Sequence, residues 1–519
     1  MEEYLTLVLK QKHIRVNRQK LASKSRYFAS LFSHNFNDSQ DQEHVINYNI
    51  AQYTLQNFVD WVHNDKCIDI HYQPIKVCLL KFMQNKNFTG LLNLLQLSVL
   101  FIVDELTNDI VNMIVFQWLS PQKVIDIWLL ARELNIKALQ DICMSVCLDR
   151  FEEIPVPVLI KLAEDDIVQL LNNVNVRVSS ESYLQNIRSK WMKHHRKSDI
   201  AHIKEGRQLK FIKGTVIYET FEDETKVGYL CTWDGNVLSR CEQLKSIQYP
   251  GKWLFGMQVI SRGFNVYTVG GNVGLGGTQF NKVISRYSLL SKKWYYESTL
   301  PVPRRHMIAV FLSNKLVIVG GVGRHRLKLY SVNILDIHTG IWKEGMQVPE
   351  SFTNIPPHCV LNGKLYVLKS SVYIYYPKED YWQTILIRDD DVIERVDTFL
   401  TCNTMLLFDG DDNLDDMIIT RIDITKDDSV CEGGECIKRS IEHKELRTYV
   451  MDVESNCRLQ LRYLQSANVG IMMVNNVSKE NGNQYLHLHT EKRDEFKQYI
   501  FPQYSCFNII DPRTLYSTA

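Results

Sequence analysis

The sequence predicts a multidomain protein with a mainly helical N-terminal half and an all-β C-terminal half. The chain has 519 residues, which exceeds the usual length of about 100–200 residues for one domain. From Phe28 to His195 apolar residues mostly recur at helical spacing, for example at Val124, Ile127 and Trp128. From Lys210 onward, short β-branched and aromatic runs alternate with the turn formers Gly, Asn, Asp and Pro. The polar, basic stretch Lys193–Arg207 is the expected boundary between the two halves.

Composition and charge exclude several classes of protein. Hydrophobic residues make up 45% and charged residues 23% of the chain, which is the ordinary balance of a globular protein. The 60 basic and 59 acidic residues leave a net charge of +1, so no global field attracts nucleic acid or a membrane surface. The longest apolar stretch, Leu91–Val103, is shorter than the roughly 20 residues of a membrane helix and predicts a buried helix. We expect neither nucleic acid nor a membrane as a partner.

The N-terminus and the cysteines favour a cytoplasmic location. Met1–Tyr4 carries acidic residues where a secretory signal carries basic ones. The 12 cysteines are scattered without the short framework of a disulfide-rich domain. Reduced thiols are therefore expected.

The β half contains an internal repeat. A strand-like run, Asn265–Val269, ends in Gly270 and Gly271, and a similar run ends in Gly320 and Gly321, fifty residues later (320 − 270 = 50). A tryptophan follows each glycine pair, and a third run lacks the pair but keeps the tryptophan. These tryptophans are Trp294, Trp342 and Trp382. Tyr287 and Tyr375 stand seven positions before the first and the third of them (294 − 287 = 7; 382 − 375 = 7).

Repeats of 40 to 50 residues with several strands each are typical of the blades of a β-propeller. An apolar strand without polar alternation is buried on both faces, as it must be between neighbouring blades. Paired glycines allow positive φ and a close backbone approach after that strand. A tryptophan supplies a large wedge between adjacent sheets. The pattern predicts that the glycine pairs, tyrosines and tryptophans are structural residues.

The segment from Val302–His306 through Gly320 and Gly321 resembles the Kelch repeat. This resemblance implies a Kelch propeller of about five or six blades over residues 206–519, with degenerate outer blades. It also implies that Arg304 and Arg305 lie near the mouth of the central channel, on the substrate-binding face. A planar guanidinium there is suited to acidic partners.

The helical half resembles the two domains that usually precede such a propeller. Arg18–Phe32 is similar to the signature of the BTB domain, and Phe58–Val62 is similar to its later helix. Ser180 and Glu181 followed by Trp191 look like the centre of the BACK domain. In that domain a Ser-Glu pair caps the start of a helix that ends in the tryptophan. The implied domains are an α/β BTB fold over 1–115 and a shortened all-helical BACK domain over 116–205.

Departures from the BTB pattern are visible in the sequence. The segment Gln73–Gly90 looks like extra material between BTB elements. The chain begins almost directly at a core strand, Tyr4–Leu9, so the usual swapped dimer contact is expected to be weak or missing. Dimerisation is therefore left open.

The resemblance implies a non-catalytic adaptor that binds cullin-3 through BTB and BACK and an unknown protein substrate through the propeller. Phe36 and Asp38 occupy the place of the hydrophobic and acidic residues that contact the cullin, with aspartate in place of the usual glutamate. Local packing of Phe36 is the alternative reading. A Kelch scaffold for cytoskeletal or signalling proteins, without a ligase, and a propeller enzyme resembling galactose oxidase are the other function classes.

Further polar motifs predict turns rather than chemical sites. Gly271–Gly277 lacks the following helix of a phosphate-binding loop, and the acidic run Asp409–Asp416 lacks the spacing of a calcium loop. Cys431 and Cys436 have no second thiol pair for zinc, and the two histidines of His487–His489 have no third ligand. We expect no catalytic residue, metal or cofactor.

Overall fold

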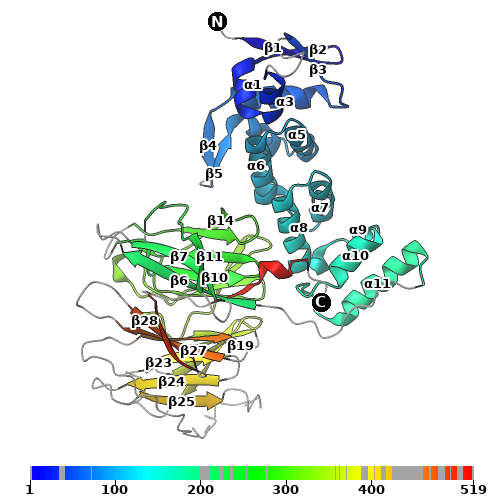
Figure 1. Ribbon diagram of the computed structural model, residues 1–519. Coiled ribbons are helices and arrows are strands. Elements are labelled where there is room, and N and C mark those ends of the chain that lie inside the picture. The colour runs from blue at the N-terminus through cyan, green and yellow to red at the C-terminus, as the bar shows by residue number, and fades with distance from the viewer. Residues whose placement is uncertain are drawn as a thin grey trace. The chain divides into compact units, whose positions relative to one another are not determined.

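The computed structural model (Figure 1) forms two compact units. The helical unit contains Met1–Lys210, Leu290–Tyr295 and Pro512–Ala519, and the β unit contains Phe211–Leu289 and Tyr296–Asp511. The residues described are 3–33, 41–71, 73–198, 211–220, 226–233, 238–252, 254–274, 279–356, 358–361, 363–369, 371–386, 396–401, 404–410, 417–423, 460–466, 469–476, 485–490, 493–499 and 507–516. No helix among them is long and apolar enough to cross a bilayer.

The chain opens with a small mixed sheet. β1 (Tyr4–Leu9) pairs antiparallel with β2 (Lys12–Asn17) and parallel with β3 (Glu43–Val45). Alternate residues of β1 are buried, as expected for a sheet that covers a core on one face. The next two helices are α1 (Arg18–Lys24) and α2 (Arg26–Leu31).

Two polar side chains begin these helices. The Asn17 side chain accepts a hydrogen bond from the Lys20 backbone N–H at the start of α1. The Ser25 hydroxyl does the same for Phe28 at the start of α2. Each side chain satisfies an N–H that the helix leaves unpaired.

Helices α3 (Gln52–His63), α5 (Phe88–Leu100) and α6 (Asp104–Met113) complete the N-terminal core. The predicted buried helix over Leu91–Val103 corresponds to α5, whose Leu91, Leu94 and Leu95 are buried. The segment Gln73–Gly90, which the sequence marks as a departure from the BTB pattern, contains β5 (Gln73–Lys76), η1 (Val77–Leu79) and α4 (Leu80–Gln84). β5 pairs with the preceding β4 (Cys67–Ile70) in a two-stranded ribbon.

The rest of the helical unit is built from short helices, as the sequence predicts. They are η2 (Ile114–Trp118), α7 (Val124–Glu133), α8 (Lys137–Asp149), η3 (Phe151–Glu153), α9 (Val156–Leu159), α10 (Glu164–Leu171) and α11 (Glu181–His195). Ser180 caps α11 by accepting from the Tyr183 N–H. Trp191 is buried and donates to the Leu162 carbonyl at 2.9 Å. The capping serine was expected from the sequence.

A segment at the end of the chain packs against these helices. It contains η5 (Pro512–Thr514) and the following Leu515. The buried Asn173 donates to the Leu515 carbonyl at 2.7 Å, and Asn175 donates to the Thr514 carbonyl at 3.1 Å. The Tyr516 hydroxyl donates to Asp141 at 2.5 Å. The C-terminal segment is thus part of the core of the helical unit.

The β unit contains, in its described residues, six antiparallel sheets of three or four strands. Their strands, in sheet order, are β30 (Phe507–Ile510), β6 (Phe211–Thr220), β7 (Lys226–Trp233) and β8 (Leu238–Gln243); β10 (Gln258–Arg262), β11 (Asn265–Val269), β13 (Val283–Ser288) and β14 (Lys293–Thr299); β15 (Ile308–Leu312), β16 (Lys315–Val319), β17 (Val332–Asp336) and β18 (Ile341–Gly345); β19 (His358–Leu361), β20 (Lys364–Leu368), β21 (Ser371–Tyr376) and β22 (Tyr381–Leu386); β23 (Val396–Thr401), β24 (Thr404–Gly410) and β25 (Met417–Asp423); β26 (Gln460–Ser466), β27 (Val469–Asn476), β28 (Tyr485–Thr490) and β29 (Arg493–Tyr499).

Neighbouring sheets contact each other through the strand of each sheet that comes first along the chain. β10 contacts β15, β15 contacts β19, β19 contacts β23, β23 contacts β26 and β26 contacts β6. β30, from the end of the chain, pairs with β6 and also contacts β10. A ribbon of β9 (Leu254–Phe255) and β12 (Asn272–Val273) lies outside these sheets.

The docked C-terminal segment generates a stability prediction. Leu515 is 2% exposed, and Leu515→Ala should lower the free energy of unfolding of the helical unit by about 2–5 kcal/mol, because a buried leucine leaves a cavity. Leu327 is 64% exposed in the β unit, so Leu327→Ala should change stability by less than about 0.5 kcal/mol. Urea unfolding of the full chain, followed by circular dichroism at the helical band, measures both. Equal midpoints for the two variants would contradict the docking.

Candidate protein-interaction surfaces

The loop between α2 and β3 is held at both stems by one arginine. The Arg18 guanidinium lies 4.1 Å from the centre of the Phe32 ring, at the end of α2. The same side chain donates to the Asp41 carbonyl at 3.0 Å, on the other side of the loop. The predicted cullin-binding residues Phe36 and Asp38 lie outside the described residues, whereas both stems are described. Arg18 therefore restrains the ends of the segment that carries them.

A cluster of charges anchors the β4–β5 ribbon to the N-terminal core. Lys76, at the end of β5, is buried, and its ammonium lies 3.8 Å from the centre of the Trp61 ring. The Trp61 indole N–H donates to Asp109 at 3.0 Å. Burial raises the pKa of Asp109. Lys76 also forms ion pairs with Glu105 at 3.5 Å and with Asp65 at 3.9 Å. A buried ammonium needs partners of this kind. Lys76 therefore fixes the β4–β5 ribbon to the N-terminal core.

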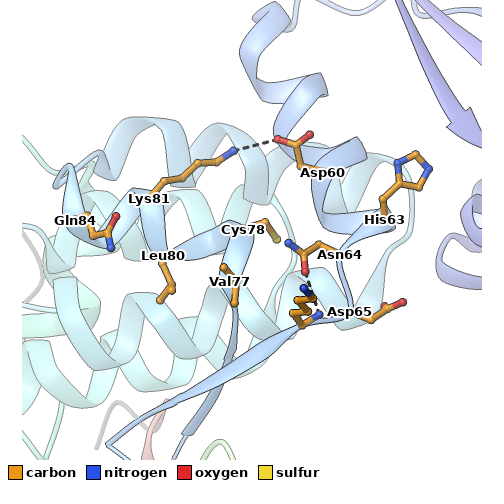
Figure 2. A pocket seen from close by; sticks show the side chains of 10 residues that line it. Asp60, His63, Asn64, Asp65, Val77, Cys78, Leu80, Lys81 and Gln84 are labelled. Carbon is orange, nitrogen blue, oxygen red and sulfur yellow. Dashed lines mark hydrogen bonds and ion pairs between the residues drawn. The ribbon is translucent and has the colours of Figure 1, made fainter.

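An open pocket lies beside this ribbon (Figure 2), between the end of α3 and the η1–α4 segment. Its volume is about 960 Å³, and it is lined by Asp60, His63, Asn64, Asp65, Lys66, Val77, Cys78, Leu80, Lys81 and Gln84. Lys81 pairs with Asp60 at 3.2 Å, so these two charges neutralise each other. Burial raises the pKa of Cys78 to about 11, which keeps the thiol protonated and unreactive at neutral pH. The pocket thus has a mixed polar and apolar lining, in which Lys81 and Asp60 form an ion pair.

The predicted glycine pairs in the β unit are required by the backbone. Gly270 and Gly271 have φ of 64° and 87°, and Gly320 and Gly321 have φ of 57° and 91°. A Cβ at Gly270 would lie 2.6 Å from the Arg304 carbonyl oxygen, and one at Gly321 would lie 2.7 Å from that of Arg305. Only glycine fits both the conformation and the space.

The aromatic residues of the repeat pack in and between the sheets. Trp342 lies on β18, and its indole N–H donates to the Ser298 hydroxyl on β14 of the preceding sheet at 3.0 Å. Trp382 donates to the Met346 carbonyl at 3.0 Å and lies 4.9 Å from the Tyr375 ring. Tyr287 is buried in β13, and Trp294 is half-buried in β14.

The structure corrects the expectation for Arg304. We expected an exposed guanidinium on a binding face, but Arg304 is 0% exposed. Its guanidinium donates to the carbonyls of Gly320 at 3.1 Å and Ser331 at 3.0 Å, and also to the Asn333 side chain. Burial lowers its pKa to about 10, so the group remains cationic at neutral pH. Arg304 is a structural residue, because carbonyls of its own sheet take up the donors that a ligand would need.

Arg305 is placed differently from its neighbour. Its side chain is half-buried and donates to the Asn272 side chain at 3.2 Å. Its backbone exchanges two hydrogen bonds with Val322, of 3.0 and 2.8 Å. Arg305 therefore remains a candidate for a binding surface. The sequence analysis did not single out the exposed cations of the adjoining loop, Arg324–Lys328, although the lack of acidic residues around them was a usable signal.

No metal centre is apparent in the part of the chain that the structure describes. No group of three or more His, Cys, Asp or Glu side chains there is arranged to hold an ion. Asp411–Asp416, Cys431 and Cys436 lie outside the described residues, and so do the side chains of His487 and His489. The predictions for those motifs stay predictions.

The two adjacent arginines generate the second prediction. Arg304→Met leaves several buried carbonyls without a donor, and each such acceptor costs about 1–3 kcal/mol. We expect Arg304→Met to lower the free energy of unfolding by about 2–4 kcal/mol and Arg305→Met to lower it by less than about 1 kcal/mol. Urea titration of the full-length variants, monitored by tryptophan fluorescence, tests this. If the two midpoints coincide, Arg304 is not the structural residue described above.

Comparison with family models finds two domains in the helical unit. The BTB/POZ domain model matches residues 5–83, and the model named BTB And C-terminal Kelch (BACK) matches residues 124–215. A search of curated proteins returned no match. The BTB match covers the sheet, the α2–β3 loop and the β4–β5 ribbon, and the BACK match begins at α7. The chain therefore contains a BTB domain and a BACK domain followed by a β-rich region, an order of domains that matches the BTB-BACK-Kelch architecture.

Proposed function

We propose that this chain is a substrate-recognition adaptor of a cullin-3 ubiquitin ligase. The observation that carries the proposal is the succession of a BTB match over residues 5–83 and a BACK match over residues 124–215, most of which lie in one compact unit. In this reading BTB and BACK bind the cullin, the β unit binds a protein substrate, and the chain itself catalyses nothing. The described cysteines are free thiols, which is compatible with a cytoplasmic site of action.

We also propose that the β unit is a closed Kelch propeller of six blades. Contacts between strands run from β10 through β15, β19, β23 and β26 to β6. β30, which pairs with β6, contacts β10 and so completes the series. β30 supplies a strand from the end of the chain to the sheet that begins the unit. Such closure protects sheet edges that would otherwise be exposed.

The substrate is expected at the end of the sheets where the second and third strands are joined. In an antiparallel sheet this end also carries the connection to the next sheet. Arg305 lies in such a connection, between β14 and β15, and the loop after Gly321 joins β16 to β17. Loops of this kind are free to vary without disturbing the sheets, so they suit substrate recognition.

A scaffold without ligase activity is the second candidate. It is favoured by Asp38, which has a shorter side chain than the glutamate usual at the cullin contact. Direct binding to cullin-3 separates the two functions.

The third prediction tests the cullin contact. Phe36→Ala combined with Asp38→Lys should weaken binding of the N-terminal domain of cullin-3 by about 2–4 kcal/mol, because it removes an apolar anchor and reverses a charge. Tyr381→Ala combined with Glu379→Lys makes similar chemical changes in the β unit, at the start of β22 and in the turn that precedes it, and should leave affinity unchanged. Calorimetry with each full-length variant, after circular dichroism has shown an intact fold, decides. Equal affinity for wild type and the Phe36/Asp38 variant would show that these residues are not the cullin contact, whereas no binding by the wild type would favour the scaffold.

The fourth prediction concerns Arg18 as a positioning residue. Arg18→Ala removes the cation over Phe32 and the hydrogen bond to Asp41, each of which contributes about 0.5–1.5 kcal/mol. Cullin affinity should therefore fall by up to roughly 5- to 150-fold, the range that corresponds to the loss of both interactions. The Thr6 amide, which donates to the Gln42 carbonyl at the loop stem, should exchange its hydrogen faster. Arg18→Lys keeps the charge and should give an intermediate affinity. An unchanged exchange rate at Thr6 would show that Arg18 does not hold the stem.

A further inference from the structure

The loop between β16 and β17 presents a group of exposed cations. Arg324, His325, Arg326, Leu327 and Lys328 are all exposed. We call residues 324–330 the basic loop. From Ser298 to Leu335 the sequence contains no acidic residue, so no carboxylate close in sequence neutralises these charges. This local excess stands out in a chain whose net charge is only +1.

Other cations of the β unit behave differently. Arg286 pairs with Glu297 at 2.9 Å, and Lys343 pairs with Asp380 at 3.3 Å. Lys369 forms an ion pair with Glu350. Among the described residues, no ion pair involves Arg324, Arg326 or Lys328. Their charges are therefore available to an external anion.

The backbone holds the basic loop in a defined shape. The Gly323 N–H donates to the Leu327 carbonyl at 2.8 Å, and the Leu327 N–H donates to the Arg324 carbonyl at 3.1 Å. His325 and Arg326 have φ of 55° and 59°, in the left-handed region that side chains disfavour. Two successive residues in that region are retained because the surrounding hydrogen bonds impose them, and such strain is typical of binding loops.

The basic loop adjoins the connection that carries Arg305. Val322 pairs with Arg305 on one side and with Lys328 on the other. Apolar side chains accompany the charges, since Leu327 is 64% and Tyr330 is 47% exposed. Arginine and tyrosine are both enriched in interface hot spots, and the exposed leucine adds apolar surface beside them.

We propose that the basic loop, together with Arg305, binds an acidic segment of a partner protein. Carboxylates or phosphates of that segment would pair with Arg324, Arg326 and Lys328, and apolar side chains beside them would contact Leu327 and Tyr330. Arginine donates two parallel hydrogen bonds to either anion. This inference rests on the proposed function, because it names the class of substrate that the adaptor takes.

The probe is a short fluorescein-labelled peptide of Glu and Asp residues interrupted by leucine. A second peptide carries Gln and Asn in place of the acids, and a third carries phosphoserine. Fluorescence anisotropy measures binding of each peptide to the full-length chain. We expect the two acidic peptides to bind and the amide peptide not to bind, and added salt should weaken binding. The ratio between the carboxylate and phosphoserine peptides identifies the preferred anion.

Charge reversal locates the site. Arg324→Glu combined with Arg326→Glu should weaken binding of the acidic peptides by about tenfold or more. Lys315→Glu combined with Lys378→Glu makes the same change of charge at turns on the opposite end of the sheets, between β15 and β16 and between β21 and β22. This control variant should bind within about twofold of wild type.

Three outcomes overturn the inference. They are equal loss in both variants, full binding by the Arg324/Arg326 variant, and tighter binding of a single-stranded RNA than of any acidic peptide. Cullin affinity is measured on the same variants. If it is retained while peptide binding does not depend on the basic loop, the inference fails and the adaptor function stands. If wild type binds the peptide through this loop but does not bind cullin, the adaptor function fails and the acidic-segment site stands.

Discussion

Arg304 determines how one sheet of the β unit joins the next. Its carbonyl accepts a hydrogen bond from the Gly271 N–H of the preceding sheet at 2.9 Å, while its guanidinium donates to the carbonyls of Gly320 and Ser331 in its own sheet. The glycine pair is needed because any side chain at Gly270 would collide with that carbonyl. Arg305 follows immediately and pairs with Val322, from which the basic loop extends. The proposed recognition surface thus depends on a buried residue that no ligand reaches.

Cations stacked on aromatic rings have a comparable role in the helical unit. Arg18 lies over Phe32 and holds the stems of the loop that is proposed to bind cullin. Lys76 lies over Trp61 and anchors the β4–β5 ribbon. In both units a scaffold cation contacts buried or half-buried carbonyls or aromatic rings, and the proposed binding loop lies beside it. This division is expected where function resides on loops and stability resides in the scaffold.

Features that depend on local sequence could be predicted. The Ser180 cap and the glycine pairs follow from short-range rules on hydrogen bonding and backbone conformation. The opposite environments of Arg304 and Arg305 could not be predicted, because two adjacent arginines have the same chemistry and only residues far along the chain determine which is buried. Similarly, the burial of Lys76 against Trp61 depends on tertiary packing and could not be predicted from the sequence around Lys76.

The central claim is that separate surfaces of one chain bind the cullin and the substrate. Titrating the N-terminal domain of cullin-3 into the full-length chain, first alone and then saturated with the acidic peptide, tests this claim most directly. The account predicts the same affinity and one-to-one stoichiometry in both titrations, with the peptide still bound at the end. Displacement of the peptide by the cullin domain, or loss of cullin binding in the saturated chain, would show that the two ligands compete and would contradict the claim.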